Sequence, residues 1–484
     1  MNPRTLRFVL YVDGLLLLIL AAAMTVPMIV DAAESQRDWL TFATSAGVTA
    51  YVGGSLAFAC RGDRGAIDRR GGYLLTASAW VVVCAFASLP LHFSSLHLSF
   101  ADAFFETMSG LTTTGSTVIT GLDHLPPGLL LWRSLLNWIG GVGIVVMAIV
   151  MLPALGVGGM QLFRTESSDI SGKPVPRAVE MAGLTVLVYV GLSVACAAAY
   201  GVAGMNFFDA VNHAMATIAT GGFSTKDASI GYYNSVPIEL VSIVFMIAGA
   251  CPLIWYARLI IHRRQALSEE RQVPALLGVL LVAIAAATVW NCATNGMSLG
   301  HSLRVSAFNV TSVLTDTGFA TSDFAGWGSF AIGLFFLLYL IGGCAGSTSG
   351  AIKIFRWQIL FVSARRQVRM MLSPHRVLAT RYGERAVDDE TVQSVRNFFF
   401  LYLLTLLILT LVVTATGIDF LSSVSAVAQA MANAGPGLGK MGGPAGNFEA
   451  FPDAAKWLLS LAMLLGRLEL STIYVLLLSD YWRG

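Results

Sequence analysis

Charged side chains are scarce in this sequence. Asp, Glu, Lys and Arg make up 12% of its 484 residues, whereas hydrophobic residues make up 56%. A soluble protein of this length could not bury so much apolar surface in its core. The composition therefore excludes a soluble globular protein and predicts a membrane protein with several spans. The net charge of +2 adds little, because the placement of Lys and Arg matters more than their sum.

Cysteine is rare, and no two cysteines have the spacing of a metal site or a disulfide framework. We expect all six to be buried packing residues: Cys60, Cys84, Cys196, Cys251, Cys292 and Cys344. The seven His residues are scattered, and no nucleophile, metal or acid–base set is clustered in the sequence. The sequence therefore favours neither an enzyme nor a resident cofactor. The N-terminal apolar run also lacks a cleavage pattern, which indicates a first span rather than a removed signal.

Apolar runs of two lengths alternate along the chain. A span needs roughly 20 apolar residues, whereas a helix of roughly 12 residues rises only about 18 Å and must turn back. After two opening spans, a long, short, long triplet occurs four times, which predicts ten crossings and four half-helices. The segments are 8–30 and 39–60, then 72–92, 102–112 and 128–153, then 181–204, 208–219 and 236–261, then 273–293, 304–315 and 328–352, then 397–416, 419–432 and 454–480.

A polar turn with a glycine follows each half-helix. The four turns recur about every 100 residues, the sign of an internal repeat, and read TTTGST, ATGGFST, TDTGFAT and NAGPGLG around Gly115, Gly222, Gly318 and Gly435. Residues two positions before these glycines carry a side-chain oxygen. The residues thirteen positions before the glycines are Asp102, Asp209, Val305 and Ser422. Three of the four suit a helix N-cap, and Val305 has Ser306 beside it.

The repeats predict a ring around a wet axis. Backbone that is not helical is tolerated at membrane depth only where protein buries it or where it lines a cavity. Four units of one orientation can enclose such a cavity. Glycine permits the positive φ that turns successive carbonyls to one side, and carbonyl oxygens can replace the water of a cation. The predicted units are 1–71 with two opening helices, then 72–178, 179–272, 273–372 with an intramembrane loop at 342–350, and 373–484 with a cytoplasmic linker.

Basic residues orient the chain, because cytoplasmic segments are enriched in Lys and Arg. With the N-terminus inside, all but seven of the 30 basic residues fall on the inner side. The seven are Arg37, Arg133, Lys226, Arg304, Lys440, Lys456 and the intramembrane Arg467. We therefore expect both termini in the cytoplasm and all four turns entering from outside.

The second crossing of each unit contains a stretch of small residues, at 140–143, 249–252, 342–346 and 466–469. Matching their first glycines places Arg467 where the other units have Gly141, Ala250 and Gly343. A buried charge faces a cavity or a partner. Arg467 is therefore either an electrostatic barrier in the pathway or half of an ion pair, for example with Glu469 of a neighbouring copy or with Glu106.

The break in the third unit is the longest, and so many glycines and hydroxyl side chains disfavour a continuous helix. It is either a gate or a passive kink, and it contains Gly342, Gly343, Gly346, Ser347, Thr348, Ser349 and Gly350, followed by Lys353. Three other residues, nine positions before their glycines, are expected to support the turns by hydrogen bonds: Glu106, His213 and Asn309.

The four signatures, the unit order and the two extra N-terminal spans resemble the Trk/Ktr/HKT superfamily of potassium transporters, and within it the bacterial TrkH type. The resemblance covers nearly the whole chain. It implies K⁺ transport across the inner membrane through a filter in which backbone carbonyls bind the ion. The implied filter residues are Thr113, Thr114, Gly115, Thr220, Gly221, Gly222, Asp316, Thr317, Gly318, Asn433, Ala434 and Gly435.

The resemblance also implies a gate formed by Arg467 and the 342–350 loop, a homodimer, and a TrkA-like cytosolic ring of nucleotide-binding regulatory domains of the RCK/KTN type. No nucleic acid partner is expected. Two alternatives stay open at this point. One is a K⁺ symporter coupled to H⁺ or Na⁺, for which Asp316, Glu106, His213 and Glu469 are the ionisable candidates, and the other is a sensor that does not conduct ions.

Overall fold

The computed structural model describes residues 3–62, 69–150, 174–261, 270–373, 380–382 and 385–483. Within these ranges the chain is helical apart from one antiparallel pair of two-residue strands, β1 (Arg381–Tyr382) and β2 (Arg385–Ala386). The last residues of the predicted crossing 128–153 lie outside the described residues. So do six of the basic residues assigned to the inner side, namely Arg64, Arg164, Lys173, Arg263, Arg264 and Arg376.

Six helical segments in the described ranges are long and apolar enough to cross a membrane. They are α1 (Pro3–Ala33), α3 (Arg69–Ala87) with α4 (Leu89–Phe93), α6 (Pro127–Val150), α9 (Pro174–Val202), α14 (Gln272–Thr294) and α18 (Asp389–Thr414). A seventh span is formed if α20 (Asp453–Arg467) and α21 (Leu470–Leu477) count as one segment bent by 114°. The chain closes with α22 (Ser479–Arg483). The protein is therefore a multi-pass, all-α membrane protein, as predicted.

The breaks predicted at 249–252 and 342–346 in the second crossings are confirmed. The segment 236–261 divides into α11 (Val236–Ala250) and α12 (Leu253–Ile261), since Pro252 follows Cys251 at the junction. The segment 328–352 contains only α16 (Ser329–Tyr339), and the glycine-rich loop separates it from α17 (Ile354–Leu372). Small residues and proline interrupt both helices because they remove helical hydrogen bonds or helix propensity.

The other two small-residue stretches behave differently from each other. The helix α6 runs without a break through Gly140 and Gly143, so the predicted break there is wrong. At the fourth stretch the chain does bend, because Glu469 adopts a positive φ of 63° between α20 and α21. In α6 the glycines instead permit close packing, since a Cβ on Gly141 would lie 2.6 Å from the Tyr189 hydroxyl.

The four predicted half-helices are present as α5 (Phe100–Leu111), α10 (Phe207–Ile218), α15 (Leu299–Leu314) and α19 (Phe420–Ala432). Their N-caps lie earlier than predicted, at Ser99, Asn206, Ser298 and Asp419. In three of them the cap side chain accepts a hydrogen bond from the backbone N–H three residues later, at Asp102, Asp209 and Ser422. The residues predicted as caps in these three helices therefore occupy the third helical position. An acidic side chain there also stabilises the N-terminal end of the helix.

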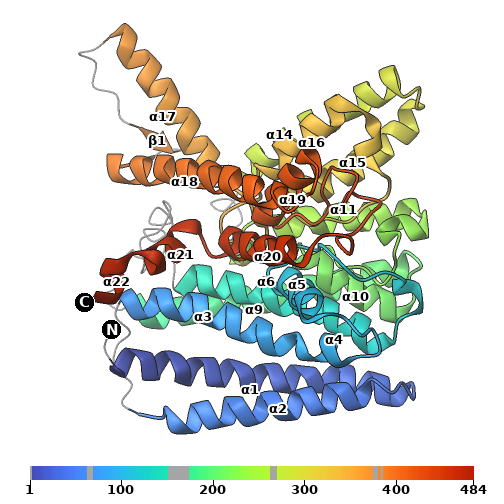
Figure 1. Ribbon diagram of the computed structural model, residues 1–484. Helices are drawn as coiled ribbons and strands as arrows, with labels where there is room; N and C mark the ends of the chain where they lie inside the picture. Colours follow the sequence, from blue (N-terminus) through green and yellow to red (C-terminus); the bar gives the residue numbers. More distant parts are fainter. Residues whose placement is uncertain are drawn as a thin grey trace.

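The opening hairpin packs beside the rest of the molecule (Figure 1). In it, α1 and α2 (Trp39–Ala59) approach closely through two glycines, since a Cβ on Gly14 would lie 2.8 Å from the Gly53 carbonyl oxygen. The two ends of the described chain lie next to each other at one end of the molecule (Figure 1). The C-terminal helix is held there because Tyr481 and Arg70 exchange two hydrogen bonds.

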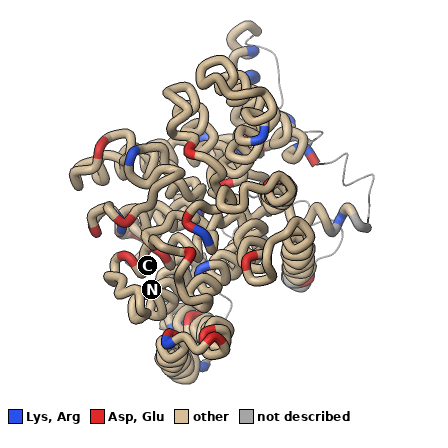
Figure 2. Tube along the Cα trace, turned by 90° about the vertical axis from the view of Figure 1, so that its right-hand side faces the viewer, with Lys and Arg blue, Asp and Glu red and all other residues tan. Residues whose placement is uncertain are grey.

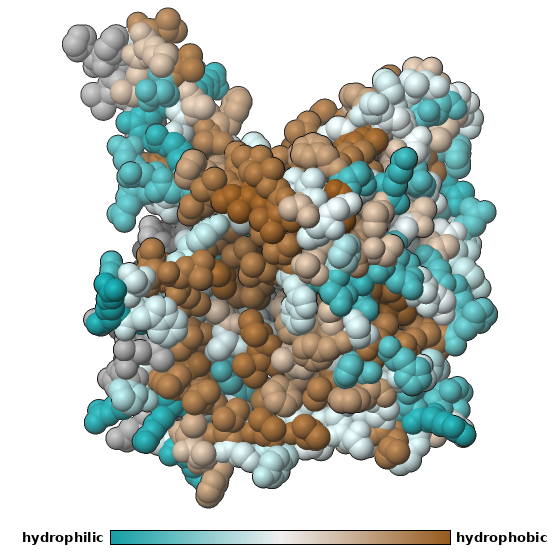
Figure 3. Space-filling model, viewed as in Figure 1, coloured by the Kyte–Doolittle hydropathy of each residue, from teal (hydrophilic) through white to brown (hydrophobic). Residues whose placement is uncertain are grey.

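The surface agrees with a membrane location. A broad hydrophobic belt lies between hydrophilic margins at the two ends of the helices (Figure 3). Charged residues are isolated along an otherwise uncharged trace (Figure 2). Short 3₁₀ helices at Leu122–His124, Ser229–Tyr233 and Phe324–Trp327 lie in the first three connections between a polar turn and the next crossing.

Candidate ion pathway

All four half-helices end in the same backbone turn. The N–H two positions before each reference glycine donates to the carbonyl three residues back, over 3.0 to 3.3 Å. The next N–H donates to the carbonyl five residues back, over 2.8 to 3.0 Å. This pairing is the Schellman motif, which satisfies helix C-terminal carbonyls and requires a left-handed residue after the cap. The four turns thus share one local structure despite their different sequences.

The left-handed residue is not glycine in any of the four turns. Thr113, Thr220, Asp316 and Asn433 have φ values of 53°, 49°, 59° and 59°. The reference glycines two residues later also have positive φ, between 70° and 89°. Such a conformation costs a residue with a Cβ about 1–2 kcal/mol. Its occurrence at four corresponding positions indicates that the tertiary structure holds the turns in place.

The four turns close into a ring through their backbones. A Cβ on Gly115 would lie 2.5 Å from the Gly221 carbonyl oxygen, and a Cβ on Gly318 would lie 2.7 Å from that of Ala434. Gly222 likewise contacts the Thr317 carbonyl, and Gly435 contacts the Thr114 carbonyl, which completes the ring. Each glycine therefore contacts the carbonyl that precedes the glycine of the next turn, and the fourth turn returns to the first.

Three of the four left-handed residues carry a buried side-chain oxygen without a partner among the described residues. Thr113 Oγ1, Asp316 Oδ1 and Asn433 Oδ1 are buried and accept or donate no hydrogen bond within the described part of the chain. The corresponding residue of the second turn, Thr220, does have partners, since its hydroxyl bonds to the Ala219 carbonyl and to Thr348. An unpartnered buried oxygen is costly unless water or a cation satisfies it. The arrangement suits a hydrated or cation-filled axis.

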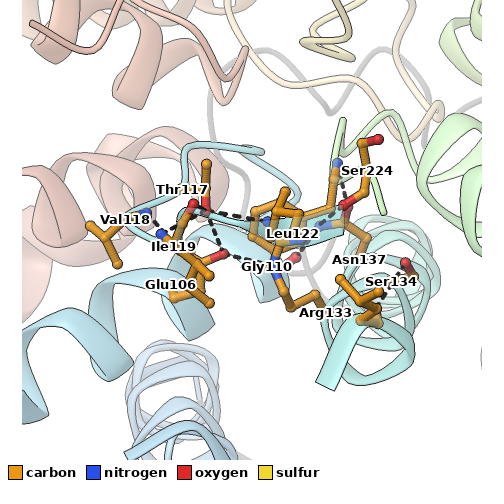
Figure 4. A network of polar contacts seen from close by, with 12 residues as sticks. Glu106, Gly110, Thr117, Val118, Ile119, Leu122, Arg133, Ser134, Asn137 and Ser224 are labelled. Atoms are coloured by element: carbon orange, nitrogen blue, oxygen red, sulfur yellow. Dashed lines mark hydrogen bonds and ion pairs between the residues drawn. The ribbon is translucent and has the colours of Figure 1, made fainter. Parts of the chain in front are cut away.

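Behind the first turn lies a buried ion pair, Glu106 with Arg133 (Figure 4). Arg133 Nε donates to Glu106 over 2.8 Å, and Glu106 accepts from the Val118 N–H and the Thr117 hydroxyl. The same guanidinium donates to the Ser224 carbonyl and stacks over the Phe223 ring, 4.2 Å from its centroid. Arg133 therefore joins the chain segments that leave the first and second turns.

His213 and Asn309 support their turns in the predicted way. His213 Nε2 pairs with the Ser224 hydroxyl at 2.9 Å, and Asn309 Oδ1 accepts from the Thr321 N–H at 3.1 Å. The fourth half-helix has Ala426 at this place. There Gln429 Oε1 accepts a hydrogen bond of 3.1 Å from Ser116 of the first turn. The predicted supporting role of Glu106, His213 and Asn309 is confirmed.

The sequence analysis missed the role of Asn137 in this scaffold. Its amide donates to the Gly110 carbonyl over 2.9 Å and accepts from the Phe223 N–H over 3.2 Å. It fills the space beside Gly221, where a Cβ would lie 2.5 Å from its side chain. A polar residue inside an apolar span is the signal that could have found it, as it could have found Arg133.

Below the turns, the 342–350 loop binds the second unit through Thr348. The Thr348 hydroxyl donates to the Ile218 and Gly249 carbonyls over 2.9 and 3.1 Å, and Thr220 donates to it over 3.2 Å. Its backbone N–H also reaches the Gly249 carbonyl. Thr348 is fully buried, so the loop is tied directly beneath the second turn.

The same loop binds the third and fourth units. Ser349 Oγ donates to Asp316 Oδ2 over 2.5 Å and accepts from the Gly343 N–H over 2.8 Å. Lys353 Nζ donates to the Ser349 carbonyl. Next to Gly350, the Ala351 N–H donates to the Ala432 carbonyl over 2.9 Å.

The remaining loop residues give it its compact shape. Gly342 N–H donates to the Ile352 carbonyl, Gly346 has a φ of 76°, and the Ser347 hydroxyl bonds to the Cys344 carbonyl. The loop is thus a folded element rather than a simple kink in a helix.

Arg467 lies at the end of α20 and is buried, with 4% of its surface exposed. Its Nε and Nη2 atoms have no hydrogen-bond partner in the described part of the chain. Within the described chain neither Glu106 nor Glu469 pairs with Arg467, because Glu106 pairs with Arg133 and Glu469 pairs with Arg356 at 2.6 Å. Arg467 therefore keeps a buried charge with unsatisfied donors, as a wet pathway would permit.

The Arg356–Glu469 pair was not predicted. Arg356 is 1% exposed, and its guanidinium also stacks over Phe398 at 3.8 Å. It connects the start of α17, just after the loop, with the bend between α20 and α21. The ion pair therefore links the segment that follows the loop to the bend beside Arg467.

At the N-terminal end of α19, Asp419 caps the helix. Hydrogen bonds from Ser422 hold the pKa of its carboxyl below the usual range. The capped half-helices all direct their C-terminal ends toward the ring, where their negative dipole ends favour a cation.

The chain resembles known membrane transporters over its full length. The family model described as TrkH, cation transport protein, matches residues 41–481. The Trk system potassium uptake protein TrkI of Halomonas elongata is 42% identical over 98% of this chain and 96% of its own length. The Trk system potassium uptake protein TrkH of Escherichia coli is 37% identical over 99% of both chains. The crystal structure of the potassium transporter TrkH from Vibrio parahaemolyticus superimposes with a TM-score of 0.91 at 34% identity and covers 100% of both chains.

Proposed function

Because this chain belongs to the TrkH family of cation transport proteins, we propose that it takes up K⁺ across the bacterial inner membrane through a gated, channel-like pore. A transporter of this family is not an enzyme. The observation that carries the proposal is the closed ring of backbone contacts between the four turns. A ring of carbonyls can replace the water around K⁺ without a full charge that would hold the ion too tightly to release.

In this proposal the ion binds at the carbonyls of the four turns. The turn residues act as three layers, and each layer has one member from every unit. The layers are Thr113, Thr220, Asp316 and Asn433, then Thr114, Gly221, Thr317 and Ala434, then Gly115, Gly222, Gly318 and Gly435. The side chains of the first layer are unequal, so the pore is pseudo-fourfold rather than symmetric.

The gate lies directly below this filter. The 342–350 loop closes the pathway because Thr348 and Ser349 tie it to the second and third turns. Arg467 adds an electrostatic barrier, since its unpaired donors repel a cation at short range. Opening requires the loop to release these hydrogen bonds and Arg467 to withdraw.

We further propose that both termini are cytoplasmic and that the chain works as a homodimer with a cytosolic ring of nucleotide-binding regulatory domains. The helix α17 supports a docking role, because it presents exposed Arg365 and Arg369 beside exposed Phe361 and Met371. Light scattering of the purified chain should give the mass of two copies. The double variant Arg365→Glu/Arg369→Glu should lose binding of the ring while it keeps the dimer mass.

Uptake of ⁸⁶Rb⁺ into liposomes that contain the purified chain tests the transport proposal. A gradient of K⁺ alone should drive uptake, and a pH gradient imposed in either direction should leave the initial rate unchanged. The variant Gly222→Ala, in which a Cβ would collide with the Thr317 carbonyl, serves as the matched inactive filter. Absence of uptake with every alkali cation would refute the proposal.

Coupled symport on the same fold is the second candidate. Asp316 favours it, because this carboxyl lies in the third turn with Oδ1 unpartnered and Oδ2 bonded to the loop residue Ser349. A symporter would be driven by the pH gradient, and Asp316→Asn would remove that dependence. If the protein is channel-like, the wild-type and Asp316→Asn proteins should show the same response to pH gradients.

A further inference from the structure

The first residue of α14 reaches the 342–350 loop. Gln272 begins this helix and is buried, with 2% of its surface exposed. Its side-chain Oε1 accepts a hydrogen bond of 2.8 Å from the Ala345 N–H of the loop. The bond therefore joins the first crossing of the third unit to the loop that interrupts the second crossing.

Gln272 differs from the other groups that hold the loop. The Cys344 and Thr348 N–H groups donate to backbone carbonyls of the second unit, over 2.9 and 3.3 Å, and the Gly343 N–H donates to Ser349 within the loop. The next N–H after Cys344 instead depends on a side chain from outside the loop. A backbone N–H that is buried without an acceptor is costly, so loss of the Gln272 oxygen should weaken the hold on the loop.

The residues before Gln272 contact the helix that follows the loop. Gln358 on α17 donates from Nε2 to the Arg271 carbonyl over 3.0 Å. The Gln272 N–H donates to the Glu270 side chain over 2.8 Å, which fixes the short segment itself. Residues 270–272 are therefore bonded to both the loop and α17. Displacement of the loop relative to this segment must break the bond between Gln272 and Ala345.

The same segment connects the loop to the protein surface. Arg271 is exposed, whereas its neighbour Gln272 and the loop residue Ala345 are buried. The proposed topology places this end of α14 at the cytoplasmic face. One side chain thus ties the buried loop to a segment at the inner surface.

We propose that Gln272 is a positioning residue for the pathway: its side-chain oxygen latches the 342–350 loop to the cytoplasmic end of α14 and keeps the pathway closed. The effect of this latch on ion flow rests on the proposed transport function. The hold on the loop does not, because it follows from the hydrogen bond alone.

The hold on the loop is measured through the thiol of Cys344, which precedes Ala345 and is fully buried. A buried thiol reacts with N-ethylmaleimide only when its surroundings open, so its rate of modification reports loop opening. In the purified full-length chain, followed by peptide mass spectrometry, Gln272→Leu should speed the modification of Cys344 by about tenfold or more, since the Ala345 N–H loses its acceptor. Gln272→Glu should keep the wild-type rate, because a carboxyl oxygen can still accept this hydrogen bond.

Cys84 and Asn291 provide the controls. The Cys84 thiol is also fully buried, but it bonds to the Phe104 carbonyl of the first unit. Its rate of modification should therefore be unchanged in a folded variant. Asn291→Leu removes a buried side-chain amide from the other end of α14 and should leave Cys344 at the wild-type rate.

Two results would overturn the latch. One is a wild-type rate at Cys344 in folded Gln272→Leu protein, and the other is equally fast modification in the Leu and Glu variants. If Gln272→Leu does not fold, Gln272→Met takes its place, since it keeps the length of the side chain and lacks the amide oxygen.

Uptake of ⁸⁶Rb⁺ into liposomes measures the effect on ion flow. Gln272→Leu should raise the initial rate by about tenfold, which corresponds to ~1.4 kcal/mol less stability of the closed state, whereas Gln272→Glu should match the wild type. Absence of uptake in every form, together with faster Cys344 modification in Gln272→Leu, would refute the transport proposal and leave the hold on the loop intact. Faster modification with unchanged uptake would refute the role of the latch in closing the pathway.

Discussion

Replacement of Gly318 by Ala tests the ring of carbonyls most directly. Gly318 has a φ of 89°, and a Cβ there would lie 2.7 Å from the Ala434 carbonyl oxygen. The positive φ costs an alanine about 1–2 kcal/mol. The contact adds a second effect, because that oxygen must retreat to about 3.4 Å before the contact becomes ordinary.

This retreat moves a proposed ion ligand by several tenths of an ångström. Differences of about that size separate the oxygen shells of cations such as Ca²⁺ and Mg²⁺. We therefore expect Gly318→Ala to lower the preference for Rb⁺ over Na⁺ by about tenfold or more. Gly435→Ala should be milder, because its Cβ would lie 3.0 Å from the Thr114 carbonyl oxygen.

The matched control is Gly417→Ala. Gly417 has a similar φ of 96°, but a Cβ there would meet no atom within 4 Å. Gly417→Ala should lose about as much stability as the positive φ alone costs Gly318→Ala. It should keep the wild-type preference for Rb⁺ over Na⁺. Thermal unfolding in detergent measures the first quantity, and competitive ⁸⁶Rb⁺ uptake into liposomes measures the second. A folded Gly318→Ala protein with unchanged ion preference would refute the assignment of the Ala434 carbonyl as a ligand.

Three further predictions concern Arg467, Glu469 and Asp419. Arg467→Ala should raise ⁸⁶Rb⁺ uptake because it removes the only barrier charge we assign to the pathway, whereas Arg467→Lys should not; equal uptake by Ala, Lys and wild-type proteins would contradict a barrier. Glu469→Gln should lower the free energy of unfolding by about 3–5 kcal/mol, since it removes the carboxylate that pairs with the buried Arg356. A shift in melting temperature no larger than that of the exposed control Glu449→Gln would speak against it. Asp419→Ala should cost about 1 kcal/mol at neutral pH. The pKa of Asp419 is lowered in the folded state, so its contribution to stability is present above about pH 4 and is lost as the pH falls further. The melting temperatures of the wild-type and Asp419→Ala proteins should therefore converge in acid. A constant difference between them would exclude the cap as the cause.

The repeat pattern could be predicted because it depends on local sequence. Half-helix length follows from the apolar runs, and the polar glycine turns follow from residues that end helices. Three of the four N-caps were predicted three residues late. In the first unit, for example, both Ser99 and Asp102 suit the first turn, and only the hydrogen bond between them distinguishes the cap from the third helical position. The break predicted at 140–143 failed because glycine in a span serves close packing as readily as it serves a bend.

The pairings of the buried charges could not be predicted. Nothing in the local sequence assigns Arg133 to Glu106 or Arg356 to Glu469, because the partners are 27 and 113 residues apart in the chain. The structure assigns one arginine to each and leaves the side-chain donors Nε and Nη2 of Arg467 without a partner among the described residues. The hydrogen bond from the Cys344 N–H to the Ala250 carbonyl also joins two units that are separate in sequence.

The sequence by itself determined the membrane class, the four half-helices and the positions of the glycine turns, since hydropathy and helix-ending residues act over short distances along the chain. Only the tertiary structure decided that each glycine contacts a carbonyl of the next turn, that the 342–350 loop is tied to three units, and which acid neutralises which arginine. The physical reason is that these contacts depend on how whole helices pack, and buried charges and carbonyls acquire their partners only in that packing.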